Sequence, residues 1–159
     1  MKAFYSLDEM KAIRAELKLQ NKKVVFTNGC FDILHMGHVD YLLKARNCGD
    51  VLVLGLNSDI SVREIKGEKR PIVPQEERAF ILSQLKAVDY VVLFDEPTPK
   101  ELIDALVPDV LVKGGDWPFD KIVGRDTVEQ NGGKVMTINF VTEASTTNII
   151  KTVIERYSK

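Results

Sequence analysis

Apolar residues gather in short runs that polar segments separate. Each run is rich in β-branched residues and almost continuously apolar, which is typical of strands buried on both faces of a parallel sheet. We therefore predict about five parallel strands. They cover residues 24–26, 51–56, 90–94, 110–112 and 135–138.

The segments between these runs have helical character. They cover residues 39–47, 75–85 and 99–106, and each begins or ends close to a proline or glycine. Strands that alternate with helices favour an α/β fold, here a Rossmann-like, doubly wound parallel sheet of about five strands. Ligands of such folds bind beyond the carboxyl ends of the strands, where the strand order reverses. We therefore expect the functional residues to follow the strands.

Two of the predicted helix starts carry capping residues. Thr98 is followed by Pro99, and Glu101 stands three residues after Thr98, which is the pattern of a capping box. Ser145 precedes the last predicted helix, and serine is a preferred capping residue. We predict side-chain caps at Thr98 and Ser145.

The first 20 residues contain one more predicted helix. Within residues 8–19, the apolar positions Met10, Ile13, Leu17 and Leu19 form a stripe suited to packing or to a dimer contact. No repeat, low-complexity stretch or flexible linker divides the chain. We expect residues 1–159 to form a single domain, with residues 1–20 as an N-terminal helix and 21–159 as the Rossmann-like catalytic core.

Composition and charge argue for one globular domain and against nucleic-acid or membrane partners. With 159 residues and 45% hydrophobic content, the chain suits one globular domain. Its 22 Lys and Arg against 23 Asp and Glu leave a net charge of -1, which excludes a global positive field for nucleic acid. No apolar run reaches the length of a signal peptide or a membrane span, so we expect a cytoplasmic protein without a membrane partner. Cys30 and Cys48 are expected to be reduced.

The segment TNGCFDILHMGH, residues 27–38, follows the first predicted strand and contains both histidines of the chain. If a helix starts near His35, His38 lies on the same face, at the positive end of the helix dipole. Two imidazole donors then point at one anion. Gly29 and Gly37 lack a Cβ, so a phosphate could approach the backbone closely there. This combination suits a nucleotide.

Other interpretations of the histidines are weaker. A zinc site would need Cys30 and Cys48, which lie far apart in the sequence and form no CxxC pair. An isolated HxGH could also be an ordinary helix start, but its position after a strand favours phosphate binding. The chain contains neither GxGxxG nor GxxxxGK[ST], which argues against a dehydrogenase and a P-loop kinase.

The HxGH motif in this position resembles the nucleotidyltransferase superfamily, which includes cytidylyltransferases, pantetheine-phosphate adenylyltransferase and class I tRNA synthetases. The resemblance implies the HxGH nucleotidyltransferase fold. It also implies that His35 and His38 hold a nucleoside triphosphate and stabilise charge while an acceptor phosphate attacks the α-phosphorus, without a covalent intermediate.

A second polar segment follows the second strand and includes KGEKRP, residues 66–71. As a charge run alone it would be a solvated loop, as we expect for Lys69. In related cytidylyltransferases, a Lys and an Arg-Pro pair in this region contact the acceptor phosphate and the nucleotide. The resemblance assigns these contacts to Lys66 and Arg70.

The segment KGGDW, residues 113–117, follows the fourth strand. Its two glycines admit a close approach and Trp117 offers a flat apolar face, so this segment looks like a base and ribose pocket. The alternative is a glycine turn with a packed tryptophan.

Near the end of the chain, Ser145, Thr146 and Thr147 stand at a helix start, where hydroxyl and backbone N–H groups could bind the β and γ phosphates. Ser145 alone could be a cap only.

Seven motifs between residues 27 and 150 closely resemble, in order, the D-glycero-β-D-manno-heptose 1-phosphate adenylyltransferase family. They are TNGCFDILHMGH, NSD, KGEKRPIVPQEER, AVDYVVLFDEPTP, PDVLVKGGDW, NGGKV and STTNII. That family makes ADP-heptose for the inner core of lipopolysaccharide, often as the carboxyl-terminal half of a bifunctional protein that also carries a sugar kinase. The resemblance implies a stand-alone enzyme and a separate heptose kinase that supplies its substrate.

The resemblance also implies the substrates, the cofactor and the site residues. ATP and a sugar 1-phosphate would bind with magnesium (Mg2+), without a protein-bound structural metal, in a homodimer. Arg78 is the least specific match, since it could instead pair with Glu76 or Glu77. The expected catalytic residues are His35, His38 and Lys66; the nucleotide-binding residues are Asn28, Gly29, Cys30, Phe31, Gly37, Lys113, Gly115, Asp116, Trp117, Ser145, Thr146 and Thr147; the acceptor-binding residues are Asp32, Asn57, Asp59, Arg70 and Arg78.

Two other functions stay open at this point. The first is a glycerol-3-phosphate cytidylyltransferase, although Val141 and Thr142 stand where those enzymes carry Arg-Thr. The second is a nucleotide sensor that keeps the phosphate-binding residues without transferring a group. His35, His38 and Lys66 are all present, which favours a transferase over a sensor.

Overall fold

The computed structural model describes residues 2–115, 118–139 and 144–158. Its five parallel strands form one sheet in the order β3-β2-β1-β4-β5. The Rossmann-like fold predicted from the sequence is confirmed, and the strand order reverses between β1 and β4. The strands are β1 (Val24–Gly29), β2 (Val51–Asn57), β3 (Tyr90–Phe94), β4 (Val110–Gly114) and β5 (Lys134–Ile138).

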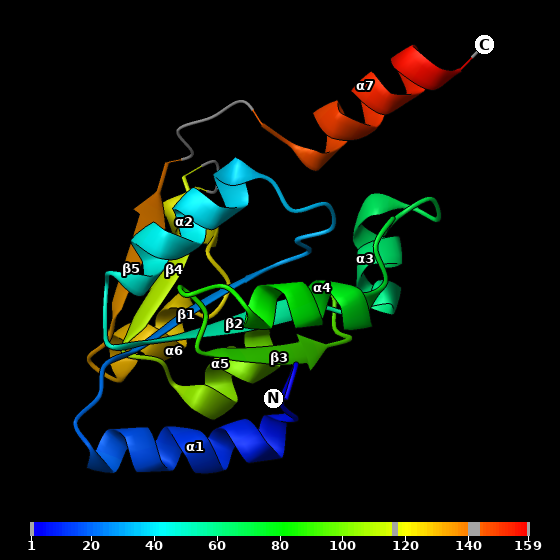
Figure 1. The fold of residues 1–159 in the computed structure, drawn as a ribbon. Helices are drawn as coiled ribbons and strands as arrows, with labels where there is room; N and C mark the ends of the chain where they lie inside the picture. Colours follow the sequence, from blue (N-terminus) through cyan, green and yellow to red (C-terminus); the bar gives the residue numbers. More distant parts are fainter. Residues whose placement is uncertain (1, 116–117, 140–143, 159) are drawn as a thin grey trace.

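Helices cover both faces of this sheet (Figure 1). A short 3-10 helix, Phe119–Lys121, follows β4. The helices are α1 (Leu7–Leu19), α2 (Met36–Arg46), α3 (Asp59–Lys66), α4 (Gln75–Ser83), α5 (Lys100–Leu106), α6 (Arg125–Gln130) and α7 (Thr146–Tyr157).

Two apolar cores lie on opposite faces of the sheet, because successive side chains of a strand point to opposite sides. Val25 packs toward α2 and α4, in a core that includes Leu42 and Leu82. Phe26, the next residue, packs toward α1, α5 and α6, in a core that includes Met10 and Ile103. Burial on both faces explains why the sequence of these strands is almost continuously apolar.

The helix starts differ from the sequence prediction at Thr98. Helix α5 has Pro99 as its N-cap and no side-chain cap, so the predicted capping box at Thr98 is wrong. Thr98 lines a pocket instead, where its hydroxyl lies beyond the carboxyl end of β3. The capping box of this chain stands at α1, where Ser6 accepts from the backbone N–H of Glu9 and the Glu9 carboxylate accepts from that of Ser6.

Three further boundaries are informative. Ser145 caps α7 as predicted, since its Oγ accepts from the N–H of Asn148 at 3.1 Å. Lys66 ends α3 rather than lying in a loop, because Ser58 caps a helix that the polar sequence concealed. Leu19, predicted to belong to the apolar stripe of α1, is 85% exposed, since it falls in the last turn, past the sheet.

Helix α7 projects away from the rest of the fold (Figure 1). Its first residue, Thr146, is buried, and the Thr146 hydroxyl donates a long hydrogen bond of 3.4 Å to the carbonyl of Ile33. The helix is amphipathic, yet Val153, Ile154 and Tyr157 remain exposed. Its start therefore contacts the β1–α2 loop while its length does not join either core.

Candidate active site

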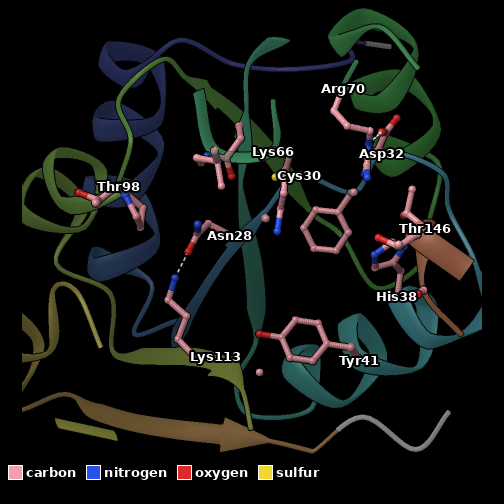
Figure 2. Close-up of a pocket in the computed structure, with 18 of the residues that line it drawn as sticks. Asn28, Cys30, Asp32, His38, Tyr41, Lys66, Arg70, Thr98, Lys113 and Thr146 are labelled. Carbon is pink, nitrogen blue, oxygen red and sulfur yellow. Dashed lines mark hydrogen bonds and ion pairs between the residues drawn. The ribbon is translucent and has the colours of Figure 1, made fainter. Parts of the chain in front are cut away.

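A cavity of about 630 Å³ opens at the carboxyl edge of the sheet, at the point where the strand order reverses between β1 and β4. This is where open α/β sheets bind their ligands. Figure 2 shows side chains from several segments converging on it, among them His38, Arg70, Thr146 and Lys113.

Most of the site residues expected from the sequence line this cavity. Gly37, Asp59, Arg78 and Gly115 do not line it, and Asp116 and Trp117 lie outside the described residues. The residues that line it as expected are Asn28, Gly29, Cys30, Phe31, Asp32, His35, His38, Asn57, Lys66, Arg70, Lys113, Ser145, Thr146 and Thr147.

The two histidines stand together at the start of α2. His35 is the N-cap residue and His38 lies in the first turn, with ring centroids 3.8 Å apart and planes inclined by 25°. Both Nδ1 atoms are buried without a hydrogen-bond partner in the described part of the chain. Buried polar atoms normally have partners, so this pair is arranged for a ligand, at a helix end that favours anions.

Burial also changes the protonation of the pair. Removal from water lowers the pKa of His38 to about 4, with a smaller contribution from the neighbouring His35, and burial lowers the pKa of His35 as well. Without a bound anion, both imidazoles are therefore neutral at neutral pH. A phosphate in contact with the rings would raise both pKa values and convert them to charged donors.

Asp32 ties the loop after β1 to the loop before α4. Its carboxylate accepts from the Nε of Arg70 at 2.5 Å and from the backbone N–H groups of Ile72 and Val73 at 2.8 Å each. Burial by itself would raise the pKa of Asp32, but the two backbone donors and Arg70 lower it below its ordinary value. Asp32 is thus an anion that fixes Arg70 at the rim of the cavity.

Arg78 has a different role from the one expected. Its side chain is fully buried below the site, and it pairs with neither Glu76 nor Glu77. The guanidinium donates to the carbonyls of Cys30, Asn57 and Val73 and forms an ion pair with Asp59 at 2.7 Å. All these partners are protein groups, so Arg78 holds the segments that form the cavity rather than a substrate.

Two glycines expected to make room for a ligand make room for protein side chains instead. A Cβ at Gly29 would lie 2.7 Å from the Phe31 ring, and one at Gly115 would lie 1.9 Å from the Asn139 Oδ1. Phe31 itself has a φ of 45°, an uncommon conformation that turns the chain between β1 and α2. Gly29 therefore makes room for the Phe31 ring in the wall of the site, whereas Gly115 makes room for Asn139 outside it.

A lysine and an asparagine meet at the ends of β4 and β1. The Lys113 ammonium donates a hydrogen bond to the Asn28 Oδ1 (Figure 2). Removal from water lowers the pKa of Lys113 to about 8. Lys66, by contrast, is exposed at the end of α3.

Sequence reasoning missed several residues of the cavity. Thr98 follows β3 at the same sheet edge, so the rule that sites follow strands could have found it. Tyr41 lies one turn after His38 on α2, and its hydroxyl bonds to the Thr27 hydroxyl at 2.7 Å. Ile122 and Val123 carry no motif, and only the folded chain brings them to the cavity.

The described residues contain no group of three or more His, Cys, Asp and Glu side chains that could hold a metal ion. Among the described residues that line the cavity, Asp32 is the one carboxylate, and it already accepts hydrogen bonds from Arg70 and two backbone amides.

Comparison with known protein families identifies the family to which the chain belongs. Residues 26–153 match the cytidylyltransferase-like family. The chain belongs to the cytidylyltransferase-like family. The match covers β1 from Phe26 onward, the other four strands and the histidine pair, and it confirms the nucleotidyltransferase resemblance drawn from the HxGH motif.

Relatives within this family are similar over nearly the whole chain. The chain is 58% identical over 154 residues to the bifunctional protein HldE of Geobacter sulfurreducens, covering 97% of this chain and 31% of that protein. It is 60% identical over 146 residues to HldE of Pelobacter propionicus, covering 92% and 30%. The chain thus spans a little under a third of the length of these relatives.

Solved structures agree with this family assignment. The lipopolysaccharide core biosynthesis protein from Thermoplasma volcanium superposes with a TM-score of 0.63 at 29% identity, covering 77% of this chain and 99% of that one. Pantothenate synthetase from Thermus thermophilus superposes with a TM-score of 0.60 at 17% identity, covering 94% and 67%, which supports the fold alone. None of the helices in the described residues has the length and apolar character needed to span a membrane.

Proposed function

We propose that this chain is an adenylyltransferase that joins the AMP part of ATP to D-glycero-β-D-manno-heptose 1-phosphate and releases pyrophosphate. The observation that carries the proposal is the stacked pair His35 and His38, with both Nδ1 atoms free and buried at the start of α2. The motifs that resemble heptose 1-phosphate adenylyltransferases and the similarity to HldE support the choice of nucleotide and acceptor.

The reaction is a single displacement at phosphorus. An oxygen of the acceptor phosphate forms a bond to the α-phosphorus of ATP, and the bond from that phosphorus to the bridging oxygen breaks, so the electron pair leaves with pyrophosphate. No general base is required, because the acceptor phosphate is already an anion at neutral pH. Catalysis therefore depends on alignment and on positive charge placed in advance.

The cavity offers that charge along its rim. His35, His38 and Lys66 would stabilise the charge that develops around the α-phosphorus, through charge-assisted bonds worth about 1.5 to 3 kcal/mol each. The start of α7, with Ser145, Thr146 and Thr147, would bind the β and γ phosphates. Magnesium, when bound with ATP, would neutralise part of the charge of the pyrophosphate.

The other expected contacts keep the roles that the resemblance implies. Gly115, Asp116 and Trp117 would form the nucleoside side of the site. Asn57, at the end of β2, and Arg70, fixed by Asp32, would face the acceptor. Asp59 and Arg78 would hold the segments around the cavity in place through their ion pair.

The proposed product is an activated heptose for the lipopolysaccharide core, and a kinase reaction must supply the sugar 1-phosphate. Because ATP is an abundant cytoplasmic metabolite, we place the reaction in the cytoplasm. The homodimer expected from the sequence stays a prediction.

A glycerol-3-phosphate cytidylyltransferase is the second candidate, because the family that matches residues 26–153 is described as cytidylyltransferase-like. The two candidates share the displacement and differ in base and acceptor. The assay below distinguishes them by pairing each nucleotide with each acceptor.

The experiment is an assay of pyrophosphate release in the presence of magnesium. ATP or CTP is paired with heptose 1-phosphate or glycerol 3-phosphate, and the variant His38→Ala is compared with Lys69→Ala, which changes an exposed residue that does not line the cavity. We expect turnover only with ATP and heptose 1-phosphate, reduced about 100- to 1,000-fold in His38→Ala and unchanged in Lys69→Ala. Turnover with CTP and glycerol 3-phosphate would establish the second candidate, and binding of ATP without any turnover would identify a sensor.

A further inference from the structure

The pairing of Lys113 with Asn28 forms a second positive position in the cavity, apart from the histidines. Phe26 pairs with Leu111 across β1 and β4, and two residues further along these parallel strands Asn28 stands opposite Lys113. Both side chains therefore point to the face of the sheet that α5 and α6 cover, the side on which Leu111 is buried. Figure 2 shows Lys113 and Asn28 together, well separated from His38 and Thr146.

Among the described residues, Lys113 has no anionic partner that would balance its charge. No ion pair to Lys113 is found in residues 2–115, 118–139 and 144–158, and its hydrogen bond goes to a neutral amide. Removal from water lowers its pKa to about 8, and no nearby carboxylate raises it. A partly buried ammonium group whose hydrogen bond goes only to a neutral amide is less stable in its charged form unless a ligand supplies the negative charge.

Several charged and titratable groups of the described residues lie on the elements around Lys113. Across the adjacent strands it faces the uncharged Asn28 and Thr137. On the helices packed on this side, Lys100 pairs with Asp104 and Arg125 pairs with Glu129. The remaining titratable groups of the neighbouring elements and of the cavity are Asp95, Glu96, Glu101, Asp120, Lys121 and Asp126, and Cys30, Asp32, His35, His38, Tyr41, Lys66 and Arg70.

The geometry of the displacement assigns a ligand to this position. Attacking and leaving oxygens lie roughly in line through the phosphorus, so the acceptor phosphate and the pyrophosphate occupy opposite sides of the α-phosphate. If the histidines and the start of α7 hold the triphosphate, the acceptor phosphate must lie on the other side. Lys113 lies with Asn28 on a side of the cavity away from His38 and Thr146 (Figure 2).

We propose that Lys113, positioned by Asn28, binds the phosphate of the acceptor sugar 1-phosphate and thereby selects a phosphorylated acceptor. This inference rests on the proposed function and revises the expectation, drawn from resemblance, that Lys113 contacts the nucleotide. Asn28 acts as a positioning residue, since its amide oxygen holds the ammonium at the end of β1 until the acceptor phosphate arrives.

Steady-state kinetics with ATP and heptose 1-phosphate test the inference. We expect Lys113→Met to raise the KM for the acceptor about 10- to 100-fold while the KM for ATP changes less than about twofold. Lys113→Arg should restore most of the acceptor affinity. Lys69→Met, which removes an exposed lysine that does not line the cavity, should change neither constant.

The pH dependence separates a binding role from a structural one. For the wild type, kcat/KM for the acceptor should fall as the pH rises above about 8, because the free Lys113 loses its proton there. The decline should approach tenfold per pH unit, and it should be absent in Lys113→Arg, which stays charged. Burial raises the pKa of Cys30 above its ordinary value, so the Cys30 thiol does not titrate in this range.

The variant Asn28→Asp gives an independent readout. An aspartate at this position would place a carboxylate on Lys113 and compete with the acceptor phosphate. We expect a higher acceptor KM than in the wild type, and a decline of kcat/KM that shifts to higher pH because the carboxylate raises the pKa of Lys113.

Two results would overturn the inference. The first is a Lys113→Met variant whose KM rises for ATP and not for the acceptor, which would return Lys113 to the nucleotide. The second is a decline above pH 8 that persists in Lys113→Arg.

Failure of the proposed reaction would be visible separately, as a wild type without turnover on heptose 1-phosphate. In that case, calorimetry with inorganic phosphate decides the inference. Phosphate binding to the wild type that is lost in Lys113→Met and kept in Lys113→Arg supports it, and equal binding by wild type and Lys113→Met overturns it.

Discussion

At the scale of single residues, the site contains basic side chains whose pKa values are lowered by burial. His35 and His38 are neutral in the empty cavity because both rings have lost water, and Lys113 has a depressed pKa for the same reason. A phosphate reverses this effect, since it stabilises the charged form of each group. The site is thus set to bind anions and to take up protons as it does so.

A first prediction concerns the stability of the ligand-free protein in mild acid. The pKa of His38 is about 4 in the folded state and 6.5 in its ordinary, unfolded range, so between these values the unfolded chain binds more protons. The free energy of unfolding should therefore decrease as the pH falls from 6.5 to 4, by roughly 2 to 3 kcal/mol from His38. Urea unfolding at several pH values measures this change.

The matched control for this prediction is His38→Asn, which cannot be protonated. The variant should lose less stability than the wild type between pH 6.5 and 4, since other titrating groups contribute equally to both. Identical slopes for the two proteins would show that His38 is not desolvated in solution.

At the scale of elements, the starts of the helices place the chemistry. Helix α2 begins at the histidines, α7 begins at Ser145 with its side-chain cap, and α5 begins without one. The sequence pattern at Thr98 has the residues of a capping box, yet the hydroxyl lies at the cavity. Local sequence therefore identified where this helix begins and not what the threonine does.

A second prediction compares the two capping-box sequences. Ser6→Ala removes a cap that the structure uses, and we expect a loss of about 1 kcal/mol in the free energy of unfolding. Thr98→Ala removes a hydroxyl that caps nothing, so its effect on stability should stay below about 0.5 kcal/mol. Urea unfolding of both variants checks the difference, and an equal loss in Thr98→Ala would mean that α5 is capped in solution.

At the scale of the whole molecule, the cavity exists because distant segments meet at one edge of the sheet. Arg78 joins three of them, through the carbonyls of Cys30, Asn57 and Val73. Asp32 makes a second tie from the β1–α2 loop to the loop before α4. These buried polar contacts fix the floor and one wall of the site.

A third prediction follows for Arg78. Replacing it with methionine leaves three carbonyls and the Asp59 carboxylate without their partner, so we expect a loss of about 3 to 5 kcal/mol in the free energy of unfolding. Arg63→Met, on the exposed surface of α3, should change stability by less than about 0.5 kcal/mol. Chemical unfolding of both variants tests this, and a small effect of Arg78→Met would contradict the role assigned here.

Much of this protein was determined by its sequence. The apolar runs predicted all five strands, the βα alternation predicted the Rossmann-like fold, and the HxGH motif placed the histidines at a helix start beyond β1. These features are local, because strand and helix periodicity and the loop after a strand are encoded by neighbouring residues. The same locality let the sequence predict most of the residues that line the cavity.

Only the tertiary structure decided which distant residues meet. The strand order and register brought Lys113 to Asn28, the burial of Arg78 turned an expected ligand contact into a support, and Phe31 filled the space left by Gly29. Each of these results depends on contacts between segments far apart in the chain. Local periodicity carries no information on such contacts, since they are set by how the elements pack together.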